Sequence, residues 1–271
     1  MAYDIRPLSF SEILDRAFRV LLDNFLLLFG IAAIVIVPTR VLFAPGGVLG
    51  NHIAGALTTV FAMIAIPIMH AALIMGVAEV YLDRPSTIID AYRSTRPIAL
   101  PYIGTFLLYF IVIFFAAGIP IGFGIEILGS EPILLAAVGL VGMACGTYFA
   151  IRWSLYGPVI VLERRFGSAA LRRSRDLISD AWWQTLGIVF VAILLANAPA
   201  LALRFIWGFI PMLGPILTGA TQAVSGAYGT VALVIYYFDR RCRTEDFDLR
   251  LLAEQVRAET KTAMPESSAL G

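Results

Sequence analysis

The sequence predicts an all-α, polytopic membrane protein with six transmembrane helices, arranged as three tandem parallel repeats. The prediction follows from the composition, from the length of the apolar runs and from the distribution of basic residues along the chain. Hydrophobic residues make up 59% of the 271 residues and charged residues only 14%, and the mean hydropathy is +0.85. A soluble domain carries about 25% charged residues, so most of the surface of this chain is expected to lie in lipid.

Six runs of mostly apolar residues are long enough to cross a membrane, for which a helix needs roughly 20 residues. The fourth run contains Arg152, but residues 134–151 within it carry no charge. Short turns rich in Gly and Pro join the first run to the second, the third to the fourth and the fifth to the sixth. The predicted spans are residues 25–43, 56–82, 102–125, 134–162, 185–207 and 215–238.

The basic residues predict the orientation of these spans. Of the 20 Lys and Arg residues, 17 lie in the N-terminal segment, the second connection, the fourth connection and the C-terminal tail. The exceptions are Arg40, Arg152 and Arg204. Basic residues are enriched in cytoplasmic segments, and an odd number of spans would divide them between the two sides. Both termini are therefore expected in the cytoplasm.

The layout predicts an internal repeat of about 75 residues, with copies at about 9–83, 86–163 and 168–239. Each copy consists of an interfacial helix, a span, a turn and a second span, and each ends on an acidic residue followed by Arg. Two spans per copy give all copies the same orientation, unlike the inverted repeats of many transporters. The prediction is one transmembrane domain, residues 1–241, and a cytoplasmic tail, residues 242–271. The tail has an amphipathic helix at 246–259 and a disordered end.

The charged segments before the odd-numbered spans are predicted to be amphipathic helices lying on the inner leaflet. Ser9 and Glu12 have capping-box spacing, which predicts a helix start there. Anionic lipid headgroups are the expected partners of the basic side chains. The alternative, favoured for lipid specificity, is that these arginines only set the topology. The candidate headgroup contacts are Arg16, Arg19, Arg172, Arg173, Arg175, Trp182 and Trp183.

Polar residues within the spans form a candidate intramembrane site. An Arg at a helix centre costs roughly 2.5–3.5 kcal/mol on insertion scales, and Arg152 precedes Glu163 by 11 residues, which is roughly 16 Å of helix. A shared internal cavity is one interpretation. The other is that Arg152 pairs with a nearby acid such as Glu79, or binds carbonyls freed by a proline, while the remaining side chains pack. The candidate residues are Arg152, His70, Gln222, Ser225 and Glu79.

The sequence lacks the motifs of the common catalytic and cofactor-binding sites. No Walker-type loop, H-E-x-x-H or G-x-S-x-G occurs, and the two His and two Cys residues show no metal-ligand spacing. We therefore expect no enzymatic activity, no cofactor and no metal. The basic segments are explained by topology, so no nucleic-acid partner is expected. Cys242, in the charged tail, is expected to be reachable from the cytoplasm.

Three stretches carry a family resemblance: PLSFSEILDRAF at 7–18, ALRRSRDLI at 170–178 and YYFDRRCRTEDFDL at 236–249. With the six-span layout, they resemble the bacterial family named for the membrane domain of glycerophosphoryl diester phosphodiesterases. The resemblance implies a multi-pass protein of the bacterial cytoplasmic (inner) membrane. Some relatives carry a fused soluble phosphodiesterase domain, which this chain lacks, so no phosphodiesterase activity is expected.

Two functions are consistent with these observations. The first is a non-catalytic membrane protein that organises lipids or partner proteins at the inner leaflet, with a protein partner bound through the C-terminal helix. The alternative is a transporter, a permease or a transporter subunit for a small molecule or lipid. Proline-interrupted spans and polar residues at mid-depth favour the alternative, whereas the parallel repeat does not.

Overall fold

The computed structural model describes residues 6–43, 52–128, 131–207, 209–210 and 213–249. Within these ranges every secondary-structure element is a helix, which confirms the all-α prediction. Most of the predicted tail helix lies outside the described residues. The elements, in chain order, are α1 (Phe10–Asp23), α2 (Phe25–Phe43), α3 (His52–Tyr81), α4 (Ile88–Thr95), a 3₁₀ turn (Arg96–Ile98), α5 (Ala99–Leu128), α6 (Pro132–Arg152), α7 (Tyr156–Glu163), α8 (Ser168–Ile178), α9 (Trp182–Trp207) and α10 (Gly214–Glu245).

The helices show a polytopic membrane protein. In the part of the chain that the structure describes, five helical segments are long and apolar enough to cross a membrane, and they correspond to the first five predicted spans. Helix α10, which contains the predicted sixth span at 215–238, is 32 residues long but is not among the five. The count of six and the repeat therefore stay predictions.

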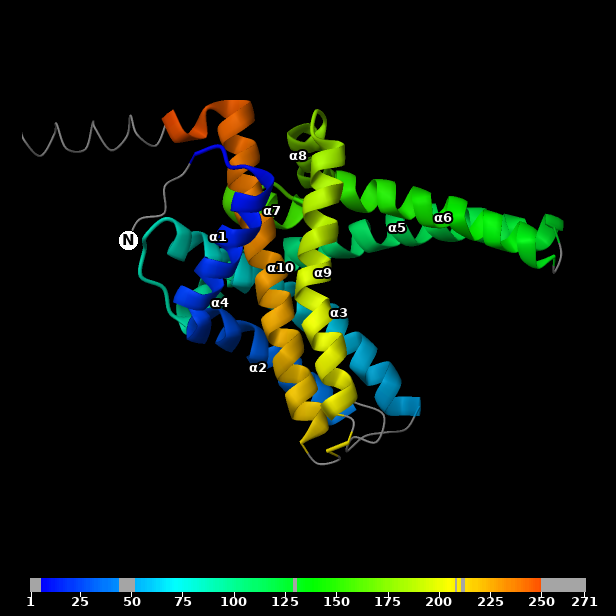
Figure 1. Ribbon diagram of the computed structural model, residues 1–271, viewed down its shortest axis with the longest axis horizontal. Helices are drawn as coiled ribbons and strands as arrows, with labels where there is room; N and C mark the ends of the chain where they lie inside the picture. Colours follow the sequence, from blue (N-terminus) through cyan, green and yellow to red (C-terminus); the bar gives the residue numbers. More distant parts are fainter. Residues whose placement is uncertain (1–5, 44–51, 129–130, 208, 211–212, 250–271) are drawn as a thin grey trace, which may run out of the picture.

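The position of α10 explains its more polar composition. It lies at the centre of the bundle and packs against α1, α2, α3, α7, α8 and α9 (Figure 1). Small residues allow this close packing, since a Cβ atom added at Gly219 would lie 3.0 Å from the Cα of Val37 in α2. Ala223 and Ala227 on the same helix are fully buried. A helix enclosed by other helices meets little lipid, so it needs fewer apolar side chains than a helix on the perimeter.

Helices α5 and α6 form a hairpin that extends away from the bundle of α2, α3, α9 and α10 (Figure 1). Their contact depends on glycine, because a Cβ atom at Gly142 would lie 2.5 Å from the carbonyl oxygen of Ala117 and one at Gly146 would lie 3.1 Å from its Cβ. This is the close helix approach that small residues at four-residue spacing permit. The root of the hairpin packs on α3 and α8.

The predicted fourth span, residues 134–162, is not one continuous helix. Helix α6 ends at Arg152, and α7 begins at Tyr156. Pro158 in the first turn of α7 has no N–H, and its ring would clash with the preceding turn of a continuous helix. Ser174 of α8 stabilises the break, because its hydroxyl accepts the N–H of Leu155 at 3.1 Å and contacts the carbonyl of Arg152 at 3.4 Å.

A group of charged side chains at the end of α10, here named the α10 clamp, joins the N-terminal segment to the bundle. The clamp consists of Asp239, Arg240 and Arg243. The carboxylate of Asp239, which is 1% exposed, accepts the N–H of Leu8 at 2.7 Å and the Nε–H of Arg243 at 3.0 Å. Arg243 also donates to the carbonyl of Leu8 at 2.7 Å.

The same clamp holds α8 through Arg240, which is 2% exposed. Its Nε–H donates to the carbonyl of Leu177 at 2.9 Å, and its guanidinium pairs with Asp180 just beyond α8. A buried charge is stable only when it is paired and hydrogen-bonded, so these contacts determine where the N-terminal segment and α8 lie against α10.

A second chain of ion pairs joins α7, α8 and α10. Glu163 accepts two hydrogen bonds from Arg173, at 2.8 and 3.0 Å, and one from the hydroxyl of Tyr237 at 2.9 Å. Arg173 also pairs with Glu245, which in turn accepts a hydrogen bond from Arg241 at 3.1 Å.

The ends of the helices differ between the copies of the predicted repeat. Helices α3 and α7 end near their acid-Arg pairs, whereas α10 continues six residues past Asp239.

Replacing Asp239 by Asn is expected to destabilise the protein by about 2 kcal/mol, because the buried side chain loses the charge that strengthens its hydrogen bonds from Leu8 and from Arg243, whose side chain is 38% exposed. Thermal unfolding in detergent measures the effect. Asp176→Asn, at an exposed acid on α8, is the matched control and should change the melting temperature little. Equal melting temperatures for the two variants would contradict the role of the clamp.

The ion pairs also predict a dependence of stability on pH. Burial alone would raise the pKa of Glu245, but hydrogen bonds from Arg173 and Arg241 outweigh it and lower the pKa below the usual 4.5. A carboxyl with a lowered folded-state pKa stabilises the protein above its unfolded pKa, and this contribution is lost as the pH falls toward the folded value. When the pH is lowered from 7 to about 4, the melting temperature of Glu245→Gln should therefore fall less than that of the wild type. A larger loss in the variant would refute this assignment.

Candidate lipid-binding site

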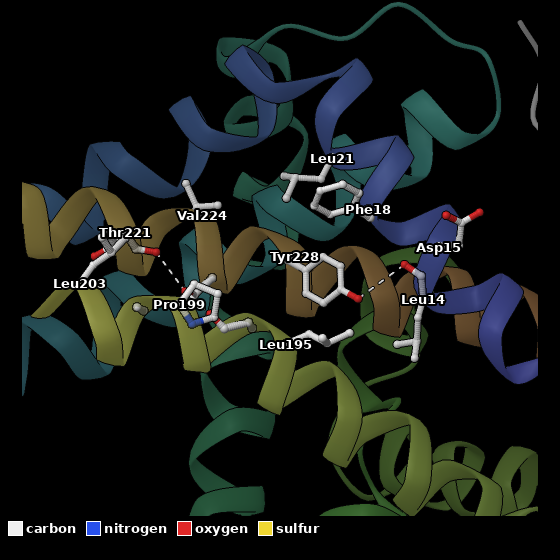
Figure 2. A pocket seen from close by; sticks show the side chains of 13 residues that line it. Leu14, Asp15, Phe18, Leu21, Leu195, Pro199, Leu203, Thr221, Val224 and Tyr228 are labelled. Atoms are coloured by element: carbon white, nitrogen blue, oxygen red, sulfur yellow. Dashed lines mark hydrogen bonds between the residues drawn. The ribbon is translucent and has the colours of Figure 1, made fainter.

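An open groove of about 660 Å³ lies between α1, α9 and α10 (Figure 2). Its volume falls within the range of about 300–1,000 Å³ that is usual for ligand pockets. Most of its surface is apolar. The lining side chains that Figure 2 labels are Leu14, Asp15, Phe18, Leu21, Leu195, Pro199, Leu203, Thr221, Val224 and Tyr228.

Helix α1 forms one wall of the groove, and a capping box fixes where it begins. The N–H of Ser9 donates to the carboxylate of Glu12 at 2.7 Å, and the N–H of Glu12 donates to the hydroxyl of Ser9 at 3.4 Å. The Ser9 N–H, followed by the guanidinium of Arg6, lowers the pKa of Glu12 to about 2. From this start, Ile13, Ala17 and Val20 are buried in the bundle, while Leu14 and Phe18 line the groove on the adjoining face.

The hydroxyl groups of the lining residues donate to backbone carbonyls. The Ser225 hydroxyl lies 2.6 Å from the carbonyl oxygen of Ala196 and 3.0 Å from that of Thr221. The Tyr228 hydroxyl lies 3.5 Å from the carbonyl of Leu14 (Figure 2). These bonds leave apolar surface facing the groove. The arrangement suits contact with a hydrocarbon chain better than bond-making chemistry.

The predicted intramembrane polar residues lie in separate places, each with a local partner. His70 lies in the core between Tyr102 and Thr230, whose hydroxyls are 3.4 and 3.2 Å from its ring nitrogens. Gln222 accepts a hydrogen bond of 2.6 Å from the Nε–H of Arg40. The structure thus gives His70 and Gln222 different neighbours and does not bring them together.

Of the other predicted residues, Ser225 belongs to the groove and Glu79 lies 4.0 Å from Arg84. Arg152 donates to the hydroxyl of Tyr148, one turn earlier on α6. The prediction assumed a continuous helix from Arg152 to Glu163, whereas the structure has a break between α6 and α7. Because α6 stops at Arg152, this guanidinium lies at a helix end beside α8.

The structure places the predicted headgroup contacts in different surroundings. Arg16 donates to the hydroxyl of Tyr81 at 3.0 Å, and Arg173 is held by Glu163 and Glu245, so these two side chains join helices. Arg19 pairs with Asp15 at 2.9 Å at the edge of the groove. By contrast, Arg172 and Arg175 line a second hollow together with Arg152. Of the tryptophans, Trp182 is half-buried and Trp183 is 78% exposed.

A model of a protein family described as a domain of unknown function, DUF8558, matches residues 51–258. The chain belongs to this family. No curated protein and no solved structure matches the chain. In this DUF8558 member the matched region runs from α3 through α10, so it includes the α9 and α10 walls of the groove and the whole of the second hollow. Helix α1 lies before it.

Among the described residues of this DUF8558 member, no three His, Cys, Asp or Glu side chains lie close enough together to hold a metal ion.

The groove was not predicted from the sequence. Its walls come from residues 14–21, 195–203 and 221–228, and the helical spacing of Leu14, Phe18 and Leu21 is the local signal that points to it.

Proposed function

We propose that this protein is a non-catalytic lipid-binding module of the bacterial cytoplasmic membrane, with both termini in the cytoplasm. The apolar groove between α1, α9 and α10 is the observation that supports it. In this proposal the groove holds one hydrocarbon chain of a lipid, and the amphipathic α1, which forms one of its walls, lies at the inner leaflet. The proposed relationship to the membrane-domain family of glycerophosphoryl diester phosphodiesterases agrees with this location.

Three features support a hydrocarbon chain as the occupant. One wall of the groove is α9, which is long and apolar enough to cross a membrane, and most of the groove surface is apolar, so lipid is the expected medium in contact with it. Its hydroxyls already donate to backbone carbonyls, so a polar ligand would gain few hydrogen bonds. On the α1 wall of the groove, the carboxylate of Asp15 pairs with Arg19 at 2.9 Å. This charged pair favours the polar headgroup of the lipid near α1 and its hydrocarbon chain further along α9.

Filling the groove tests this proposal. Leu195, labelled in Figure 2, lines it and is 50% exposed, so Leu195→Trp adds bulk where the chain would lie. Leu140→Trp, at a lipid-facing Leu of α6 that is 61% exposed, is the matched control. In vesicles that contain a phospholipid with a photoreactive acyl chain, crosslinking to α9 and α10 should fall several-fold in Leu195→Trp alone. Uniform labelling of all apolar helices, or an equal fall in both variants, would refute the groove as a binding site.

The orientation needs introduced cysteines. Cys242, the reporter expected from the sequence, is 3% exposed, and burial raises the pKa of its thiol to about 11, so it should react poorly in the folded protein. Ser179, between α8 and α9, and Glu131, before α6, are exposed. With Cys145 and Cys242 replaced by Ala, Glu131→Cys should react with an impermeant maleimide in intact cells. Ser179→Cys should react only after permeabilisation, and the reverse pattern would overturn the proposed orientation.

A further inference from the structure

The hollow between the end of α6 and α8 gathers three guanidinium groups. It has a volume of about 570 Å³ and shares no lining residue with the groove. Two of its arginines come from α8 and one from the last residue of α6. The lining side chains that matter here are Tyr148, Arg152, Trp153, Ser168, Arg172 and Arg175.

We propose that this hollow binds a lipid headgroup carrying two phosphate groups. The proposal extends the lipid binding proposed above to a second, separate site, and it rests on different residues. Guanidinium groups bind phosphate oxygens through paired, charge-assisted hydrogen bonds. Basic pockets between membrane helices on the cytoplasmic side are suited to multiply charged lipid headgroups.

The backbone brings the three arginines together. Helix α6 ends at Arg152, just before the break that precedes α7, and Ser174 of α8 hydrogen-bonds to the backbone of Leu155 and Arg152 on the two sides of that break. Arg172 and Arg175 are three residues apart on α8, so they lie on one face of the helix. Arg173, between them in sequence, turns the other way to Glu163 and Glu245. Only one face of α8 therefore serves the hollow.

The charges of the hollow favour a dianionic headgroup. Of its three guanidiniums, Arg175 is partly offset by Asp176 at 3.1 Å, which leaves about two positive charges without an acidic neighbour in the lining. Ser168, the first residue of the 11-residue helix α8, also lines the hollow. A helix N-terminus carries a partial positive charge and favours phosphate.

Aromatic side chains place the hollow near the boundary between lipid and water. The Arg152 guanidinium lies 5.5 Å from the ring centroid of Tyr148, and that ring lies 6.0 Å from the ring of Trp182. Trp and Tyr are enriched at membrane–water interfaces. An apolar helix ending here would bring lipid headgroups to the same depth, so a phosphate that reaches the arginines is expected to belong to a lipid.

The test uses nanodiscs and native mass spectrometry of the whole protein. Discs of phosphatidylcholine contain either cardiolipin, which has two phosphates, or phosphatidylglycerol at equal total charge. The wild type should retain cardiolipin in preference to phosphatidylglycerol. The double variant Arg172→Gln/Arg175→Gln should lose about ten- to thirty-fold of the cardiolipin affinity, since an Arg near an anionic lipid contributes about 1 kcal/mol. Both side chains lie at the surface, so thermal unfolding should stay close to that of the wild type.

Matched variants decide between the site and general surface charge. Arg164→Gln/Arg165→Gln removes two exposed arginines next to α8, outside the hollow, and should leave cardiolipin retention unchanged. An equal loss in both double variants, or no preference of the wild type over phosphatidylglycerol, would overturn the proposal.

Two further experiments distinguish a lipid headgroup from free diphosphate as the ligand of the hollow, and distinguish the hollow from the groove. Inorganic diphosphate in detergent should not displace the lipid; displacement at similar affinity would overturn the assignment to a lipid headgroup. Leu195→Trp should leave cardiolipin retention intact. The proposals for the groove and for the hollow can therefore be refuted independently, since acyl-chain crosslinking reports on the groove and headgroup preference reports on the hollow.

Discussion

The buried charges at the end of α10 are the constraint on which the rest of the bundle depends. Asp239 and Arg240 are both almost fully buried, and each finds its partners on a different part of the chain: Leu8 before α1, and Leu177 with Asp180 at the end of α8. Unpaired, either charge would cost several kcal/mol in this setting. The backbone of the N-terminal segment and the end of α8 are thereby held in position.

Both candidate sites follow from that constraint. With Leu8 held against α10, α1 begins two residues later and packs along α10, which makes it the third wall of the groove. With Leu177 held on the other side, α8 lies against the end of α6 and its outward arginines face Arg152. Each site includes an amphipathic helix, α1 in the groove and α8 in the hollow, and the α10 clamp positions both helices.

The sequence predicted the helices well and their breaks less well. Apolar runs of sufficient length identify helices because the signal is local, and the structure has helices at all six predicted runs. The break before Tyr156 depends on Pro158 together with Ser174, which hydrogen-bonds to Leu155 from 19 residues further along the chain. Pro67 and Pro199 lie within continuous helices, so proline by itself does not identify the break. The prediction of a continuous helix therefore missed that Arg152 is the last residue of α6.

The candidate sites were harder to predict for a related reason. Amphipathic spacing predicts that α8 has a charged side, but neighbouring residues on a helix point about 100° apart. Which arginine turns inward depends on Glu163 and Glu245, carboxylates from α7 and α10. Similarly, Arg16 was predicted as a headgroup contact from its place on α1, and the sequence pattern did not indicate its hydrogen bond to the Tyr81 hydroxyl. The side chains that contact each arginine in the folded protein determine its role. The sequence pattern identifies only which arginines are candidates.

The contact between Leu8 and Asp239 also has a consequence for biosynthesis. The two residues are 231 positions apart, which at about 5–20 residues per second corresponds to roughly 10–50 s of translation. During that interval the first helix has been made but its anchor has not. We therefore expect the nascent chain to pass through an open intermediate that closes only after Asp239 of α10 has been made, so truncation before residue 239 should leave the N-terminal segment undocked.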